Sequence, residues 1–302
     1  MIERKPPFGA TRADARVALV TCGELPDLEP DDRLVIEPLA DRGVRAEPAV
    51  WDDPRVDWAG YDLVVLRSPW DYVSRRPAFV EWAHRVPRLA NPATVVAWNT
   101  EKTYLELLAA AGVPVVPTEW VHPGDSWGPP ATGAYVVKPA ISAGSLDTGR
   151  YDLADPGHRV LAAAHVARLQ AADRLVMVQP YLTAVDSDGE TAVLFIGGTF
   201  SHAIRKGPML AGPDTAEAGL YRPEQITARE PSPAQLEVAG KALAAIPGGV
   251  DSLLYARVDL IPGPDGSPML VELELTEPSL FLSRSAGAAE RLADAIAARV
   301  LT

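Results

Sequence analysis

Three carboxylates stand where core residues are expected between Val258 and Leu275. Side chains alternate along a strand, so Glu272 and Glu274 lie on one face. The Pro264-Asp265-Gly266 turn folds the strand of Asp259 back beside them. Like charges this close raise one another's pKa unless a cation neutralises them, and carboxylate oxygens suit Mg²⁺, which usually also bridges substrate phosphates. The pattern predicts either a magnesium site for phosphate chemistry or a half-exposed strand whose glutamates face water.

Lysine is rare in this chain, with only five among 28 basic residues, so a lysine in an apolar segment stands out. Lys138 ends the apolar strand expected over 134–139, and a buried ammonium there needs an anion such as phosphate. Lys102 begins a helix expected over 102–111. Taken alone, Lys138 could also reach water from a strand end, and Lys102 could be a solvated residue of a first helical turn.

Composition narrows the class of protein. The 302 residues predict two or three compact units, and no apolar run approaches the roughly 20 residues that span a bilayer. The first residues lack the apolar core of a secretion signal, so we expect a cytoplasmic protein without a membrane partner. A net charge of −12 argues against a nucleic-acid partner. Cys22 is the single cysteine and is expected at the end of a buried strand.

Helix and strand patterns divide the chain into three parts. From about 15 to 90, strands at 17–21 and 63–67 flank a helix at 32–42, which predicts a small α/β unit with a parallel sheet. The second part holds the Lys138 strand, a helix at 156–171 and a strand at 175–182. The third holds a hairpin (192–196, 199–205), a long loop (207–233) expected to be a lid, helices at 234–245 and 286–300, and the acidic hairpin.

Two other types of site are not supported. Gly124, Ser126 and Gly128 match the GxSxG motif of serine hydrolases, but prolines on both sides prevent the strand and helix that this motif requires. The five histidines show no zinc spacing, and no GxxxxGK[ST] phosphate loop is present.

With these motifs in this order over about residues 60–285, the chain resembles the ATP-grasp superfamily of carboxylate ligases, in the branch of glutathione synthetase. Within it, the pattern is most similar to cyclo-ligases that form cycloserine from O-ureidoserine. The resemblance implies an ATP-grasp α/β (α+β) fold with three units. These are an N-terminal parallel-sheet substrate domain (1–95), a small lid subdomain (96–183) and a C-terminal subdomain with the magnesium site (184–302).

The resemblance also implies an ATP site. In that family two lysines grip the phosphates, a flap covers them, a hinge binds adenine and an acid holds the ribose. The matching positions are Lys102, Lys138, Ser142, Gly144, Ser145, Gln179, Tyr181, Leu182 and Glu190, with Asp186 as the alternative acid.

The metal ligands and the phosphoryl-transfer residues are also implied by the resemblance. Asp259, Glu272 and Glu274 match the positions that bind Mg²⁺, expected as two ions, and Glu274 replaces an asparagine of glutathione synthetase. Arg205 matches the arginine that stabilises the transferring phosphoryl group, with Lys138 as the second catalytic residue. The predicted substrate contacts are Arg67, Ser68, His202 and Ser279. Arg67 is predicted from its place at the carboxyl end of a strand, where α/β sheets bind ligands, and it could instead cap a loop or pair with a nearby acid.

The implied function is an ATP-dependent carboxylate–amine ligase that acts through an acyl phosphate. Its substrate is expected to be an amino acid or a small peptide-like molecule, and intramolecular ring closure in antibiotic biosynthesis is one option. Two alternatives stay open: a carboxylate kinase that releases the phosphorylated product, and a non-catalytic ATP-binding module. No residue names the acceptor, and a homodimer also stays open.

Overall fold

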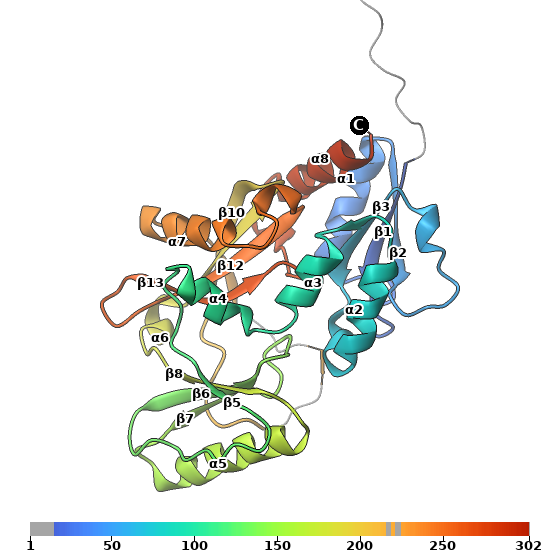
Figure 1. Cartoon of the computed structure of the whole chain (residues 1–302). Coiled ribbons are helices and arrows are strands. Elements are labelled where there is room, and N and C mark those ends of the chain that lie inside the picture. Colours follow the sequence, from blue (N-terminus) through green and yellow to red (C-terminus); the bar gives the residue numbers. More distant parts are fainter. Residues whose placement is uncertain (1–14, 216–218, 221–224, 302) are drawn as a thin grey trace, which may run out of the picture.

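The computed structural model of the protein describes residues 15–215, 219–220 and 225–301, and its strands form three sheets (Figure 1). The N-terminal sheet has the order β2-β1-β3-β4, and all its pairs are parallel. The predicted parallel sheet is therefore confirmed. Its strands are β1 (Ala15–Thr21), β2 (Val44–Val50), β3 (Leu63–Ser68) and β4 (Leu89–Ala90).

Both faces of this sheet are covered. On one face, Val17, Leu19 and Val65 pack with α1 (Ile36–Asp41) and α8 (Ala288–Val300). On the other, Val64 and Leu66 pack with α2 (Arg76–Arg85). Every residue of β3 is buried, which fits the apolar run over 63–66. Cys22 lies directly after β1 and is buried and unpaired, as predicted.

The second sheet forms a small separate layer with α5 (Pro156–Ala171) beneath it (Figure 1). Its order is β5-β8-β6-β7, and all its pairs are antiparallel. Asp155 caps α5 through the Gly157 amide, and the predicted helix bounds are confirmed. The strands are β5 (Glu119–Val121), β6 (Ala134–Pro139), β7 (Gly149–Asp152) and β8 (Val176–Pro180).

The third sheet is antiparallel, with the order β11-β10-β9-β12-β13, and it contains the acidic hairpin. The long loop predicted over 207–233 contains a short strand, β11 (Ile226–Arg229), so the loop prediction is wrong for these four residues. Residues 216–218 and 221–224 of the same loop lie outside the described part of the chain. The strands are β9 (Glu190–Ile196), β10 (Thr199–Lys206), β11 (Ile226–Arg229), β12 (Tyr255–Pro262) and β13 (Pro268–Glu274).

The remaining elements are short helices around these sheets. The α-helices are α3 (Ala93–Asn99), α4 (Tyr104–Ala110), α6 (Val185–Asp188) and α7 (Pro233–Ala244). The 3-10 helices are η1 (Asp32–Val35), η2 (Trp58–Gly60), η3 (Trp70–Arg75), η4 (Val250–Ser252) and η5 (Leu282–Arg284). In the described residues, no helix is both long and apolar enough to cross a bilayer.

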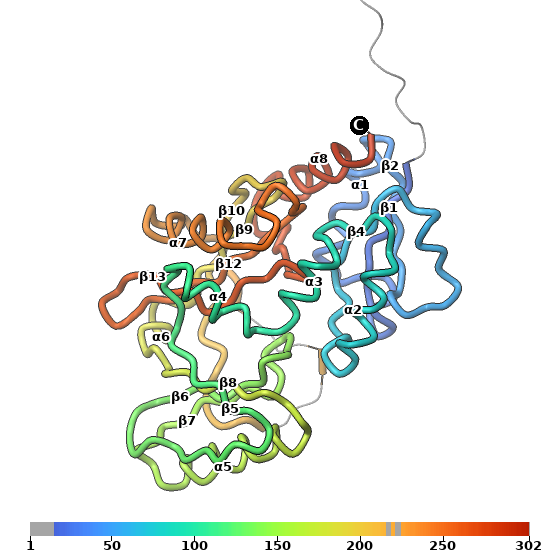
Figure 2. Tube along the Cα trace, viewed as in Figure 1, coloured from blue at the N-terminus to red at the C-terminus, as the bar shows by residue number. Residues whose placement is uncertain are grey.

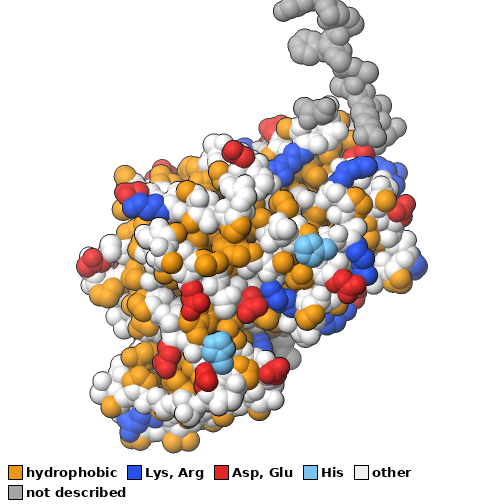
Figure 3. Space-filling model, in the orientation of Figure 1, with side chains coloured by type: hydrophobic (Ala, Val, Ile, Leu, Met, Phe, Trp, Pro, Cys, Tyr) orange, Lys and Arg blue, Asp and Glu red, His pale blue; other side chains and the backbone are white. Residues whose placement is uncertain are grey.

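Two of the hydrophobic cores cross the predicted unit boundaries. The C-terminal helix α8 packs beside α1 of the N-terminal unit, and Figure 2 shows these two helices side by side. Residues of α4 pack against β12 and β13. The boundaries at residues 95 and 183 therefore stay a prediction. On the face shown in Figure 3, acidic and basic side chains are interspersed without a continuous basic stripe.

Candidate active site

A cavity of about 710 Å³ opens between the second and third sheets and extends to the N-terminal unit. Most of the predicted site residues line it: Lys102, Lys138, Ser142, Gly144, Ser145, Gln179, Tyr181, Leu182, Glu190, Glu272, Glu274 and Ser279. Asp259 is buried behind this wall, with 1% of its surface exposed.

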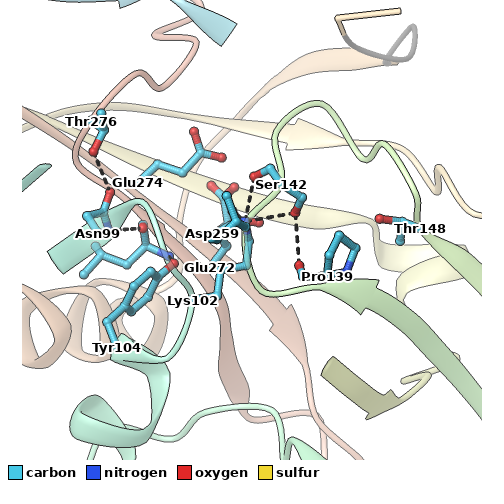
Figure 4. Close-up of polar contacts among 12 residues, drawn as sticks. Asn99, Lys102, Tyr104, Pro139, Ser142, Thr148, Asp259, Glu272, Glu274 and Thr276 are labelled. Atoms are coloured by element: carbon cyan, nitrogen blue, oxygen red, sulfur yellow. Dashed lines mark hydrogen bonds and ion pairs between the residues drawn. The ribbon is translucent and has the colours of Figure 1, made fainter. Parts of the chain in front are cut away.

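The acidic hairpin has the predicted geometry. Asp259 of β12 lies opposite Glu272 of β13, and Arg257 lies opposite Glu274. Because side chains alternate along each strand, these four residues share one face. That face is turned toward the cavity and not toward bulk water, and Figure 4 shows Asp259 and Glu272 gathered beside Lys102.

Each of these carboxylates pairs with a cation of the protein. Lys102 Nζ lies 3.0 Å from Glu272 Oε1. Lys206 Nζ lies 2.7 Å from Asp259 Oδ2 and 2.6 Å from Glu190 Oε1. Arg257 donates from Nε to Asp259 Oδ1 at 2.9 Å and also pairs with Glu274. The charges are thus neutralised in a network that spans β9, β10, β12 and β13.

Lys102 is held in place by the residues around it. The side chain of Asn99 donates to Leu273 O at 2.7 Å and accepts from the Leu275 amide at 2.7 Å, so the end of α3 is bound to β13 (Figure 4). The Lys102 amide donates to Ala140 O, and Lys102 Nζ donates to Ser142 O at 2.8 Å. Lys102 therefore bridges the acidic hairpin and the predicted phosphate flap.

Burial makes the charges of the network unequal. It raises the pKa of Glu274 to about 8, against the opposing charge of Arg257, and raises that of Glu190 to about 7, against Lys206. At Asp259, burial is outweighed by Arg257 and Lys206, which hold its pKa well below the usual range. Glu274 and Glu190 are thus only partly neutralised by the protein, and a further cation would stabilise their charged forms.

Lys138 has no such partner. It is 8% exposed, faces the cavity from β6, and makes no ion pair with the residues that the structure describes. Burial lowers the pKa of its ammonium group, the charge of Glu272 opposes this, and Lys102 adds to it. A buried cation directed into a cavity favours an anionic ligand there.

The described residues contain no group of three or more acidic, histidine or cysteine side chains already arranged around a metal position. The basic residues explain this, because Lys102, Lys206 and Arg257 occupy the space between the acids. The donor set of Asp259, Glu272 and Glu274 fits Mg²⁺, since it consists of hard carboxylate oxygens and burial raises the pKa of Glu274. A metal would take over neutralisation that the lysines and the arginine now provide.

Arg205 does not line the cavity, in contrast to its predicted catalytic position. Its guanidinium donates to the carbonyls of Asp188 and Ser187 at 2.8 and 3.0 Å, at the end of α6. The cause is a bulge in β10 between Phe200 and His202, which shifts the register by one residue. Lys206, and not Arg205, therefore lies opposite Glu190 and faces the cavity.

Three of the four predicted substrate residues also lie outside the cavity wall. Arg67 is fully buried, lies over the Tyr255 ring and donates to Pro278 O at 2.8 Å. Ser68 is hydrogen-bonded to Thr21. His202 Nε2 donates to Leu280 O at 2.9 Å. Arg67 and His202 thus hold the backbone of the loop that follows β13, and only Ser279 of the four lines the cavity.

Arg257 and Lys206 line the cavity although neither was predicted as a site residue, and Tyr72 and Glu277 line it near them. Arg257 could have been found, because it precedes Asp259 by two residues and so shares its face. Lys206 depends on the bulge, and a single sequence does not reveal a bulge. Tyr72 and Glu277 come together only through contact between the N-terminal unit and the loop after β13.

Lys206→Met tests the charge network. It removes the cation that Glu190 and Asp259 share, so their pKa values rise and the buried charges lose compensation. We expect the variant to lose about 3 kcal/mol of unfolding free energy at pH 8. The loss shrinks toward pH 5, because protonation of Glu190 then removes the uncompensated charge.

Urea unfolding with EDTA at both pH values measures the effect. The exposed pair of Lys241 and Glu237 supplies a control, since Lys241→Met is expected to cost less than about 0.5 kcal/mol at either pH. An equal loss for Lys206→Met at pH 8 and pH 5 contradicts the electrostatic explanation.

Known proteins resemble this chain along almost its whole length. A family model described as the N-terminal domain of D-cycloserine synthetase DcsG matches residues 17–91. The cycloserine biosynthesis protein DcsG of Streptomyces lavendulae is 40% identical over 301 residues, which cover 94% of this chain and 98% of the relative. The crystal structure of D-cycloserine synthetase DcsG is 37% identical, with a TM-score of 0.81 over 95% of this chain and 100% of that one.

A more distant structure shares the fold. The ATP-grasp ligase PsnB, solved with a variant of its minimal precursor, Mg and ADP, is 20% identical, with a TM-score of 0.63 over 96% of this chain and 100% of that one. The predicted ATP-grasp fold is thus confirmed, and so is the resemblance to the cycloserine cyclo-ligases. This protein belongs to the ATP-grasp ligases, in the family of the D-cycloserine synthetase DcsG.

Proposed function

We propose that the protein joins a carboxylate to a nitrogen nucleophile at the expense of ATP, through an acyl phosphate. One observation carries this proposal: two buried lysines and a ribbon of three acids meet at a single cavity. A triphosphate with Mg²⁺ has the charges that such a cavity needs, since the lysines match its phosphates and the acids match its metal.

ATP is proposed to lie between the second and third sheets. Lys138 from β6 and Lys102, two residues before α4, bind the phosphates from two sides, and Ser142, Gly144 and Ser145 cover them. Gln179, Tyr181 and Leu182 line the adenine end of the cavity. Glu190 is assigned to the ribose, because Asp186 does not line the cavity and is already bound by Arg150 and Tyr181.

Mg²⁺ is proposed to bind Asp259, Glu272 and Glu274, as two ions that neutralise the phosphates. When bound, the metal supplies charge stabilisation at the transferring phosphoryl group. The network prepares the carboxylates for this role, because the basic residues keep Asp259 and Glu272 ionised and Arg257 holds Glu274 in place in the absence of the metal. Once phosphates arrive, these basic side chains would turn toward them.

In the first step, a substrate carboxylate oxygen attacks the γ-phosphorus and ADP leaves. Arg257 replaces Arg205 as the proposed arginine of this step, since its guanidinium lies among the acids on the cavity wall. In the second step, a nitrogen attacks the acyl carbon and phosphate leaves. His202 takes no part in this proposal, because its Nε2 is bound to Leu280 O.

We propose the substrate from the activity of the relatives. DcsG is a D-cycloserine synthetase, so we assign this protein an amino-acid substrate of the O-ureidoserine type and an intramolecular ring closure. The N-terminal unit (1–95) is proposed to form the acceptor side. Residues 96–183 then close over the nucleotide, and residues 184–302 carry the metal ligands. Residues 207–210 of the proposed lid line the cavity beside Ser145.

A product assay separates the ligase from both alternatives. The protein is mixed with Mg-ATP and O-ureidoserine, and ADP, phosphate and ring product are followed. We expect ADP and free phosphate in equal amounts with the product. ADP without free phosphate would indicate a kinase, and no turnover would indicate a binding module. Lys138→Ala is expected to abolish turnover while the thermal unfolding temperature stays close to that of the wild type.

A matched pair of arginine variants tests the corrected catalytic position. Arg257→Lys keeps the charge but loses the planar fork that contacts two acids, so we expect kcat to fall by about 100-fold. Arg205→Lys is expected to change kcat by less than about threefold. Steady-state kinetics with saturating Mg-ATP measure both. The reverse order of the two effects would restore Arg205 to the catalytic role.

A further inference from the structure

The loop from Leu275 to Leu280 is held at every residue. Each of its six backbone carbonyls accepts a hydrogen bond from a side chain, at distances between 2.6 and 3.1 Å. In chain order, the donors are Asn91, Tyr255, Trp70, Arg67, Arg257 and His202. Because every carbonyl of the loop is bound, the backbone keeps one conformation without a ligand, and the side chains on it are preorganised.

The loop lies where the N-terminal unit meets the third sheet. Arg67 and Trp70 reach it from the end of β3, whereas Arg257 and His202 reach it from β12 and β10. Directly after the loop, Phe281 adopts a φ of 48°, in the left-handed region that is unfavourable for a bulky residue. Such strain persists only where the surroundings impose it, and it concentrates at ligand sites.

Glu277 projects from this loop into the wall of the cavity, against Tyr72. The other acids of the wall are already engaged. Glu272, Glu274 and Glu190 have ion pairs. Glu29 and Asp31 accept hydrogen bonds from backbone amides. Glu277 makes no ion pair with any residue that the structure describes, so its charge is available to a ligand.

The surroundings of Glu277 favour a cationic ligand. Burial raises its pKa to about 7, while the Tyr72 hydroxyl and the charge of Lys102 act against this rise. The pKa of Tyr72 is raised well above its usual value, first by burial and then by Glu277, so its hydroxyl stays a donor. A carboxylate held in this way gains stability when a ligand brings a positive charge beside it.

We propose that Glu277 binds the ammonium group of an amino-acid substrate, with the Tyr72 hydroxyl holding the carboxylate in place. This inference deepens the proposed function and rests on it. Arg257 donates to Ser279 O at 3.1 Å, so the same loop fixes both the ammonium site and the proposed catalytic arginine. A substrate anchored by its ammonium group extends its carboxylate toward Arg257, and an acid without an amino group lacks the anchor.

Glu277→Gln tests this role with two compounds that differ only in the amino group. The probes are O-ureidoserine and 3-(ureidooxy)propanoate. In the variant, we expect the KM for the amino acid to rise by about 10- to 100-fold, because a charged hydrogen bond is lost. The KM for ATP and the affinity for the propanoate stay within about twofold of the wild type. Glu277→Asp keeps the charge and is expected to recover part of the loss.

Two further variants control for structure. Glu106→Gln makes the same change on the exposed side of α4 and is expected to leave every constant unchanged. Tyr72→Phe keeps Glu277 and is expected to weaken binding of the amino acid in the same selective way, by less. If Glu277→Gln unfolds at a lower temperature, the comparison is made on Glu277→Asp and Tyr72→Phe.

Calorimetry with a non-hydrolysable ATP analogue gives the same comparison without turnover. The inference is overturned if the wild type does not prefer the amino acid, or if Glu277→Gln weakens both compounds equally or neither. Absence of turnover in the wild type, with selective binding retained, would instead contradict the proposed ligase activity alone.

Discussion

The site depends on the neutralisation of acids that the fold has buried together. β12 and β13 place Asp259, Glu272 and Glu274 on one face, where their charges would repel one another without compensation. Lys102, Lys206 and Arg257 provide that compensation at short distances. Breaking a buried pair leaves an uncompensated charge, which costs several kcal/mol. We propose that this charge network exchanges partners when Mg²⁺ and phosphate bind.

The same residues connect the site to the rest of the molecule. Arg257 contacts the acids and also the carbonyl of Ser279, so the acidic hairpin and the loop from Leu275 to Leu280 are fixed together. Arg67, which was predicted to bind substrate, reaches the same loop from β3. The N-terminal unit therefore helps to fix the geometry of this loop, through hydrogen bonds from Arg67 and Trp70 to its backbone.

Local patterns predicted much of this structure. The apolar run of β3, the acidic hairpin and the bounds of α5 follow from periodicity and turn residues, which act over a few neighbouring positions. The family resemblance supplied the order of the site residues. It placed Arg205 at the cavity, whereas one extra residue in β10 moves Lys206 into the register opposite Glu190. The pairing of Glu277 with Tyr72 could not be predicted, because the two residues are about 200 positions apart and only tertiary packing brings them together.

We propose that the three acids exchange their protein cations for a metal when ATP binds. A crystal structure of the protein with Mn²⁺ and a non-hydrolysable ATP analogue tests it most directly, because manganese gives an anomalous signal. We expect manganese within about 2.3 Å of oxygens from Asp259, Glu272 or Glu274, and phosphates in contact with Lys102 and Lys138. Acids that keep all their ion pairs to Lys102, Lys206 and Arg257, with the metal and phosphates elsewhere, would contradict the account.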